Sequence, residues 1–323
     1  MAQSTTSAHL ARTFGWAMLA TLLVYLINTV LTLGFQWPGP ASVLGGEVSL
    51  LGALQLALYV LGVVVAWQWV SRNPAVTLRT EAEQINRFNV FLIRGLFWSV
   101  LLIGLADMAI SFLRVEDLLE GFFGEQLARD LGKPRFRGPE VHMPLLFLGF
   151  VIACVTRGLA FHWLALLIVV AELAIVFTRF VFSYEQAFMG DLVRFWYAAL
   201  FLFASAHTLY ADGHVRVDVF YAGMSPQGKG FINAIGATAM GCAMCWTILL
   251  NGLGSKSAII YSPMVNFEVS QSGFGMYTKY LMAGFLGVFA ITMLIQFVSQ
   301  FLEATADYRG DPDARVIESA SAH

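Results

Sequence analysis

The fold is decided by a stretch that reads TRFVF at 178–182, GDLVRF at 190–195 and HVRVDVF at 214–220. The charges in this stretch bracket apolar runs instead of interrupting them. Because a charge in the middle of a bilayer is costly, membrane segments keep most of their charges near the two water boundaries. The stretch therefore predicts successive membrane helices with charged residues at their ends.

The composition of the whole chain agrees with this interpretation. The chain is 58% hydrophobic and 12% charged, whereas about a quarter of the residues in soluble domains are charged. A soluble protein of this size could not hide so much apolar surface, since exposed patches promote association. We therefore expect an integral membrane protein embedded in the lipid bilayer. The net charge of −2, with no long basic run, argues against a nucleic-acid partner.

A helix needs about 20 apolar residues to cross the hydrocarbon core of a bilayer. Backbone polar groups find no water there, so such spans are expected to be α-helical. The sequence predicts an all-α integral membrane protein with about eight transmembrane helices, or seven if the short run 143–156 lies on the membrane surface. The other seven runs are 14–35, 49–70, 90–113, 163–182, 195–211, 231–253 and 277–300.

The orientation follows from Lys and Arg, which favour short loops on the cytoplasmic side. Loops 36–48 and 183–193 contain neither residue, whereas loop 71–89 contains three arginines. An arrangement of eight spans with both termini in the cytoplasm places each of these loops on the side that the rule predicts. Segment 114–142 is an exception, because its five cations would lie outside despite the rule.

The sequence also suggests a division near residue 142. Residues 1–142 supply three spans and a charged amphipathic connector, and 143–303 supply a four-helix unit with a short helix before it. Residues 304–323 form a polar tail that we expect in the cytoplasm. The first span, 14–35, is longer than the core of a usual signal peptide, so we expect it to be retained.

Two acidic residues, Asp107 and Glu172, lie inside predicted spans. A charge at the bilayer centre costs at least about 2.5–3.5 kcal/mol on insertion scales. Asp107 is seven residues before Arg114, so snorkelling toward the outer boundary is one explanation for it. Glu172 is central, and we expect it to hydrogen-bond in protonated form or to pair with a cation of a partner subunit. Structural or interface roles are favoured over transport chemistry for both.

Cysteine and histidine give weaker signals. Cys242 and Cys245 form a Cys-x-x-Cys pattern inside an apolar run, where we interpret them as packing residues. His162 and His207 fall near the same ends of adjacent predicted spans, and two facing histidines could hold a haem. No attachment motif supports this, so we predict no metal site and no cofactor. A haem-binding redox subunit remains the main alternative from another functional class.

The charged motifs, taken in order, resemble those of the small membrane subunit of tripartite ATP-independent periplasmic (TRAP) transporters, the DctQ family. That family shows an Arg-Tyr-Val-Phe-like end to its first helix, an acidic-Leu-x-Arg start to its second, and then a His-(Ile/Val)-x-Val-Asp cluster. Asn266, Glu268 and Ser270 resemble its approach to the last helix, and the resemblance covers roughly 160–303. It makes eight residues candidates for partner contacts: Arg179, Asp191, Arg194, His214, Arg216, Asp218, Glu268 and Ser270.

The resemblance implies a non-catalytic small permease subunit in the bacterial inner membrane. Its partners would be a DctM-like large permease subunit, which carries the substrate and sodium sites, and a periplasmic binding protein that delivers an organic acid. Two positions depart from the family pattern: Tyr210-Ala211-Asp212 replaces a basic residue, and Asp191 alone replaces an acidic pair. No phosphate loop or hydrolase motif indicates an enzyme. A free-standing secondary carrier is a further alternative, although no internal repeat is evident.

Overall fold

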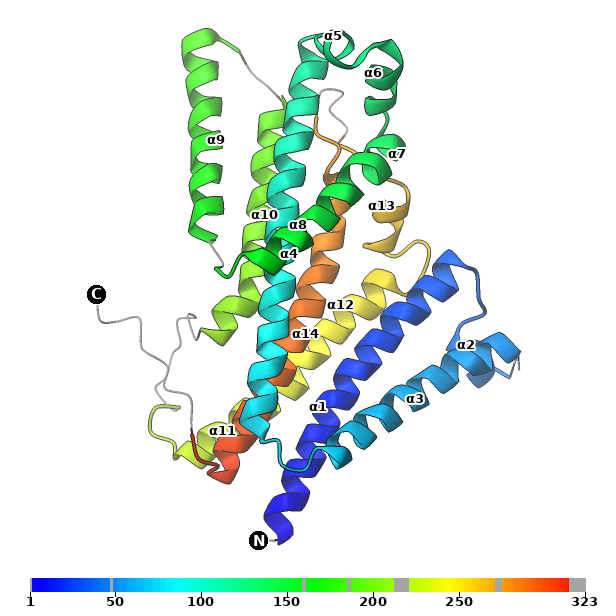
Figure 1. Cartoon of the computed structure of the whole chain (residues 1–323), viewed down its shortest axis with the longest axis vertical. Coiled ribbons are helices and arrows are strands. Elements are labelled where there is room, and N and C mark those ends of the chain that lie inside the picture. The colour runs from blue at the N-terminus through cyan, green and yellow to red at the C-terminus, as the bar shows by residue number, and fades with distance from the viewer. Residues whose placement is uncertain are drawn as a thin grey trace. The chain divides into compact units, whose positions relative to one another are not determined.

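The structure is a computed structural model that describes residues 2–46, 49–158, 161–184, 187–211, 221–270 and 275–313. All regular elements in these ranges are helices, shown in Figure 1. The α-helices are α1 (Ala2–Thr29), α2 (Pro40–Leu44), α3 (Leu50–Arg72), α4 (Leu78–Val115), α5 (Leu119–Phe123), α6 (Glu125–Leu131), α7 (Pro134–Arg137), α8 (Met143–Val155), α9 (Phe161–Phe182), α10 (Ala187–Tyr210), α11 (Pro226–Ile235), α12 (Ala243–Leu253), α13 (Tyr261–Val265) and α14 (Lys279–Arg309). Three π-helical segments, η1 (Val30–Gly34), η2 (Gly138–His142) and η3 (Gly236–Cys242), continue neighbouring α-helices.

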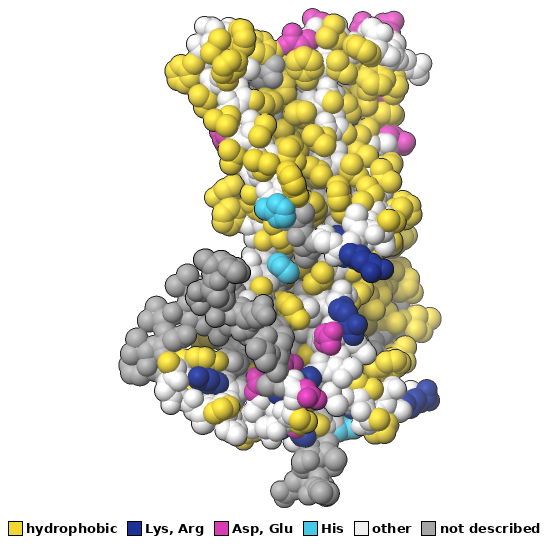
Figure 2. Space-filling model, turned by 60° about the vertical axis from the view of Figure 1, so that its left-hand side comes forward, with side chains coloured by type: hydrophobic (Ala, Val, Ile, Leu, Met, Phe, Trp, Pro, Cys, Tyr) yellow, Lys and Arg dark blue, Asp and Glu magenta, His cyan; other side chains and the backbone are white. Residues whose placement is uncertain are grey.

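Eight helical segments within the described residues are long and apolar enough to cross a membrane, which confirms the predicted all-α membrane fold. Large apolar side chains are exposed along these segments, and Figure 2 shows them covering much of one face of the molecule. Such a surface is soluble in lipid and not in water. The segments are Thr6–Gly34, Leu50–Arg72, Leu78–Val115, Pro134–Val155, Phe161–Phe182, Phe188–Tyr210, Pro226–Leu253 and Lys279–Arg309.

The short apolar run at 143–156 belongs to a longer helical segment. α7, η2 and α8 join into the 22-residue segment Pro134–Val155, which is long enough to span. Its α8 part packs closely on α4: a Cβ atom added at Gly149 would lie 2.3 Å from Ser99 Oγ. Ser99 Oγ also donates a hydrogen bond to the carbonyl of Leu146 at 2.9 Å. A glycine is therefore required where the two backbones approach, as is common between membrane helices.

Several helices extend beyond their predicted apolar runs. α4 begins at Leu78, well before the predicted start at 90, and its added turns bury the polar residues Glu81, Asn86 and Asn89. α14 continues to Arg309, although the polar tail was predicted from 304. Hydropathy ends a predicted span where polar residues begin, whereas a helix continues while those residues find partners. Residues 314–323 of the predicted tail lie outside the described residues.

The described helices contribute to two compact units. Unit 1 comprises 1–89, 208–256 and 293–323, and unit 2 comprises 90–207 and 257–292. The long helices α4 and α14 each contribute residues to both units. The proposed sequence division at 142 follows a different criterion and stays a prediction.

Unit 1 contains a buried ion pair between α1 and α4. Arg12 donates from Nε and Nη2 to the two carboxylate oxygens of Glu81, at 2.9 and 2.8 Å. Arg12 Nη2 also donates to the carbonyl of Asn73 at 2.8 Å. The two side chains are 4% and 2% exposed. This fork geometry satisfies both charges and fixes the start of α4 against α1.

Candidate functional site

A buried ionic network in unit 2 surrounds Asp107 of α4. Its Oδ1 accepts a hydrogen bond from Arg137 Nη1 at 2.7 Å and lies 3.1 Å from His142 Nε2. Its Oδ2 accepts from the backbone N–H of Tyr277 at 2.8 Å. The side chains of Asp107, Arg137 and His142 are all 0% exposed. Both carboxylate oxygens are therefore used by the chain itself.

The π-helical segment η2 explains how Arg137 and His142 reach the same carboxylate oxygen. A π-turn closes hydrogen bonds between residues five apart, so side chains with that spacing lie on one side of it. Arg137 is held further by its Nε donating to the Leu131 carbonyl at 2.9 Å. Its guanidinium also lies 4.2 Å from the ring centroid of Tyr277, where the ring face is negative.

Two tyrosines connect this network to the start of α14. Tyr280 OH lies 2.8 Å from His142 Nδ1, and the two rings stack with centroids 5.8 Å apart. Tyr277 OH donates to the Gly132 carbonyl at 2.9 Å and receives a hydrogen bond from Arg114. The network thus connects residues 107–142 to residues 277–280 by hydrogen bonds and stabilises their arrangement within unit 2.

The structure does not support snorkelling toward the membrane boundary, which was one of the explanations considered for Asp107. The residue is fully buried, because Arg137 and His142 from a different segment reach it inside unit 2. Sequence reasoning counted Arg137 as one cation of a charged connector and did not single out His142. The signal for this pairing was the group of five cations in 114–142, whose predicted outside location the positive-inside rule does not explain.

Asp191 and Arg194 share one face of α10, as their spacing predicts. Arg194 Nη1 lies 3.5 Å from Asp191 Oδ1, while Asp191 Oδ2 accepts a hydrogen bond from the backbone N–H of Met276 at 3.0 Å. The Asp191 side chain is 12% exposed and that of Arg194 is 74% exposed. Asp191 therefore fixes the chain before α14, and Arg194 is the member of the pair that remains accessible.

The other boundary candidates do not gather into one site. Glu268 forms an ion pair with Lys279 at 2.6 Å, with both side chains about half exposed. Arg179 lies in the last turn of α9, where a cation complements the helix dipole. Ser270 lies in the segment before α14 and has an interaction of its own. His214, Arg216 and Asp218 lie outside the described residues.

Glu172 differs from every other predicted site residue in the part of the chain that is described. It lies on α9 and is exposed. Neither a hydrogen bond nor an ion pair connects it to any described residue. The buried residues of α9 are Leu164, Ile168 and Ala171, so none lies beyond the level of Glu172.

Of the cysteines and histidines singled out in the sequence, the Cys242/Cys245 pair is buried, whereas His162 is exposed and His207 is half-buried. Cys242 and Cys245 are buried and unpaired, in agreement with the packing interpretation. The ring of His162 lies 5.6 Å from Trp163, and that of His207 lies 5.9 Å from Phe161. Among the described residues, no three His, Cys, Asp or Glu side chains are grouped in a way that could hold a metal ion.

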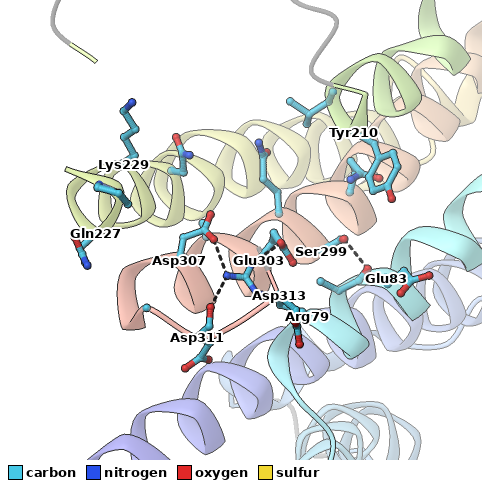
Figure 3. A pocket seen from close by; sticks show the side chains of 18 of the residues that line it. Arg79, Glu83, Tyr210, Gln227, Lys229, Ser299, Glu303, Asp307, Asp311 and Asp313 are labelled. Carbon is cyan, nitrogen blue, oxygen red and sulfur yellow. Dashed lines mark hydrogen bonds and ion pairs between the residues drawn. The ribbon is translucent and has the colours of Figure 1, made fainter. Parts of the chain in front are cut away.

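Unit 1 contains a polar cleft of about 820 Å³ between α4, α11 and α14. Arg79 lines this cleft, and Figure 3 shows its side chain beside Glu303 and Asp307. Arg79 donates to both of these carboxylates and to the backbone carbonyls of Asp311 and Pro312. The Arg79 guanidinium is therefore already hydrogen-bonded to acceptors of the chain itself and is not available to bind an anionic substrate.

Comparison with known proteins gives one family result. The model of the family described as "Tripartite ATP-independent periplasmic transporters, DctQ component" matches residues 165–306. This range agrees with the extent of the resemblance seen in the sequence. No curated protein and no solved structure gives a significant match. Residues 165–306 therefore form a DctQ domain of the TRAP small-permease type, and further membrane helices precede this domain.

Proposed function

We propose that this chain is a non-catalytic scaffold for a DctM-like large permease subunit in a TRAP transporter. The DctQ match at 165–306 carries this proposal. The buried network around Asp107 supports a rigid role, because both Arg137 and His142 contact this carboxylate with their side chains fully buried. A subunit built in this way suits a fixed support for a moving partner better than it suits alternating access.

The transport chemistry is assigned to the partner subunits. In this proposal a periplasmic binding protein delivers an organic acid, and the large permease subunit couples its uptake to sodium. Support comes from the polar cleft of unit 1, whose arginine is already neutralised by Glu303 and Asp307. We propose that the chain itself needs no cofactor and catalyses no reaction.

The proposed location is the bacterial inner membrane, with both termini in the cytoplasm. The difficulty for this orientation was the set of cations in 114–142. Three of them pair with acids: Arg129 with Glu125, Lys133 with Asp130, and Arg137 with Asp107. Of these three, only Arg137 is withdrawn from the exposed segment, because it is fully buried against Asp107. Cysteine labelling from each side of the membrane at exposed Arg135 would test this orientation.

Purification from the native membrane tests the central proposal. The tagged chain would be extracted in several mild detergents, and the proteins that co-elute would be identified by mass spectrometry. We expect a stoichiometric, larger, multi-pass permease subunit. Elution of the chain alone in all detergents would contradict the scaffold role, and sodium-driven uptake by this chain alone in vesicles would favour a free-standing carrier. A Soret band in the purified protein would instead favour the haem alternative.

A further inference from the structure

Glu172 lies at a depth where a lipid-exposed carboxyl group is unfavourable. α9 runs for 22 residues from Phe161 to Phe182, and Glu172 is at its middle. A helix of this length just crosses the hydrocarbon core, so its midpoint is near the bilayer centre. The short side chain of glutamate cannot reach either boundary from there. Acids in such positions usually face protein or water rather than lipid.

α9 is fixed at its ends and is little covered in its second half. At its start, the ring of Phe161 packs against Phe97 at 6.0 Å and against His207 at 5.9 Å. After its end, Tyr184 OH hydrogen-bonds to Glu116. Between Glu172 and Phe182 no residue is buried. In the view of Figure 1, α9 lies at the edge of unit 2 with no ribbon beyond it.

The apolar residues of this exposed half need no protein partner, because lipid tails can cover them. Glu172 does need one, since lipid offers its carboxyl group no hydrogen bond. Residues three and four positions away lie on the same face of the helix. Ile168 and Ile175 occupy two of these positions and lie toward unit 2, where Ile168 is buried. The outward side of the face is formed by Val169, Glu172 and Val176, and the two valines are 53% and 50% exposed.

We propose that the Val169–Glu172–Val176 face of α9 is the docking surface for a membrane helix of the large permease subunit. That helix supplies a cation or a hydrogen-bond donor to Glu172 at the bilayer centre. The proposal rests on the proposed scaffold function and specifies where the partner binds. A second copy of this chain fits less well, because a two-fold dimer about this face would place two Glu172 side chains against each other.

Photo-crosslinking tests the surface without altering Glu172. A benzophenone amino acid is placed at Val169 or Val176 in the tagged chain, co-expressed with the large permease subunit in native membranes. Val170 and Phe177 are matched controls: they are 51% and 58% exposed but lie about 140–160° from Glu172 around the helix, and about 100° from the adjacent test position. We expect cross-links to the large subunit from the first pair and much weaker ones from the second. Equal cross-linking from both pairs, or none from the first, would overturn the proposal.

Substitution of Glu172 tests the polar contact. Glu172→Leu should reduce the amount of large subunit retained after washing by about tenfold, as expected for loss of a polar contact between membrane helices. Glu172→Gln, which keeps hydrogen-bonding capacity, should retain more than Glu172→Leu. Monodisperse elution of both variants controls for folding.

The outcomes separate the two proposals. Retention by the wild type together with unchanged retention by Glu172→Leu would overturn the docking surface and leave the scaffold function standing. If the wild type retains no large subunit, both proposals fail. Cross-links between two copies of this chain would assign the face to a homodimer instead.

Discussion

Asp107 and Glu172 are the two acids that the sequence places inside membrane spans, and the structure gives them opposite surroundings. Asp107 is fully buried and is held by Arg137, His142 and a backbone amide. Glu172 is exposed and has no partner among the described residues. The first acid stabilises the subunit from within, and the second is free for contact with another protein. An intramembrane charge is thus informative only when its neighbours are known.

The largest effect that would test this contrast comes from Asp107→Leu. The substitution leaves Arg137 and His142 buried without their acceptor, and removal of one partner of a buried pair costs about 3–5 kcal/mol. We expect the detergent-solubilised variant to melt at a clearly lower temperature in a size-exclusion thermostability assay. The double variant Asp107→Leu/Arg137→Leu should recover much of the loss. A melting temperature equal to that of the wild type would remove the structural role of the network.

A smaller effect is expected from Tyr280→Phe. The change removes the hydroxyl group that lies 2.8 Å from His142 Nδ1 and leaves a buried ring nitrogen unpaired. The expected loss is about 1–3 kcal/mol of unfolding free energy. Tyr197→Phe is the matched control, since that tyrosine is 54% exposed and outside the network. If both variants lose the same stability, the hydroxyl of Tyr280 does not contribute to the stability of the network around Asp107.

Arg194→Ala tests, on a smaller scale, the same difference between a buried and an exposed charged residue near the start of α10. The guanidinium is 74% exposed and its ion pair with Asp191 is long, so its removal should cost less than about 1 kcal/mol. Asp191→Ala, by comparison, removes the acceptor of the Met276 amide and should cost more. Reversal of this order in thermal melting would mean that the pair, and not the amide contact, holds the segment before α14.

The smallest effect on the isolated subunit is expected from Glu172→Leu. No hydrogen bond or ion pair within the described chain is lost, and leucine is more soluble in lipid than glutamate is. The free energy of unfolding should therefore stay within about 0.5 kcal/mol of the wild type or rise. A marked loss of stability in the absence of a partner would show that Glu172 has a role inside the subunit, and the comparison with Asp107 would no longer hold.

The sequence was sufficient for the number and type of membrane helices, because hydropathy reports the lipid environment directly. It also placed Asp191 and Arg194 on one helix face, which depends on local geometry alone. The surroundings of Asp107 could not be predicted in this way. Its partners lie 30, 35 and 170 residues away, and the π-turn that aligns two of them leaves no clear sequence pattern. Asp107 and Glu172 therefore looked equivalent until tertiary contacts distinguished them.

The wide spacing of these partners also bears on how the subunit is made. During synthesis from the N-terminus, Asp107 enters the membrane first, and Arg137 and His142 follow soon afterwards. The amide of Tyr277 arrives 170 residues after Asp107, together with the last span. The polar centre of unit 2 is therefore complete only after residue 277 has been synthesised. In a chain that stops before residue 277, Asp107 Oδ2 lacks its backbone donor inside the bilayer. This unpaired oxygen is a chemical feature by which membrane quality control could distinguish such a chain from one that has passed this point.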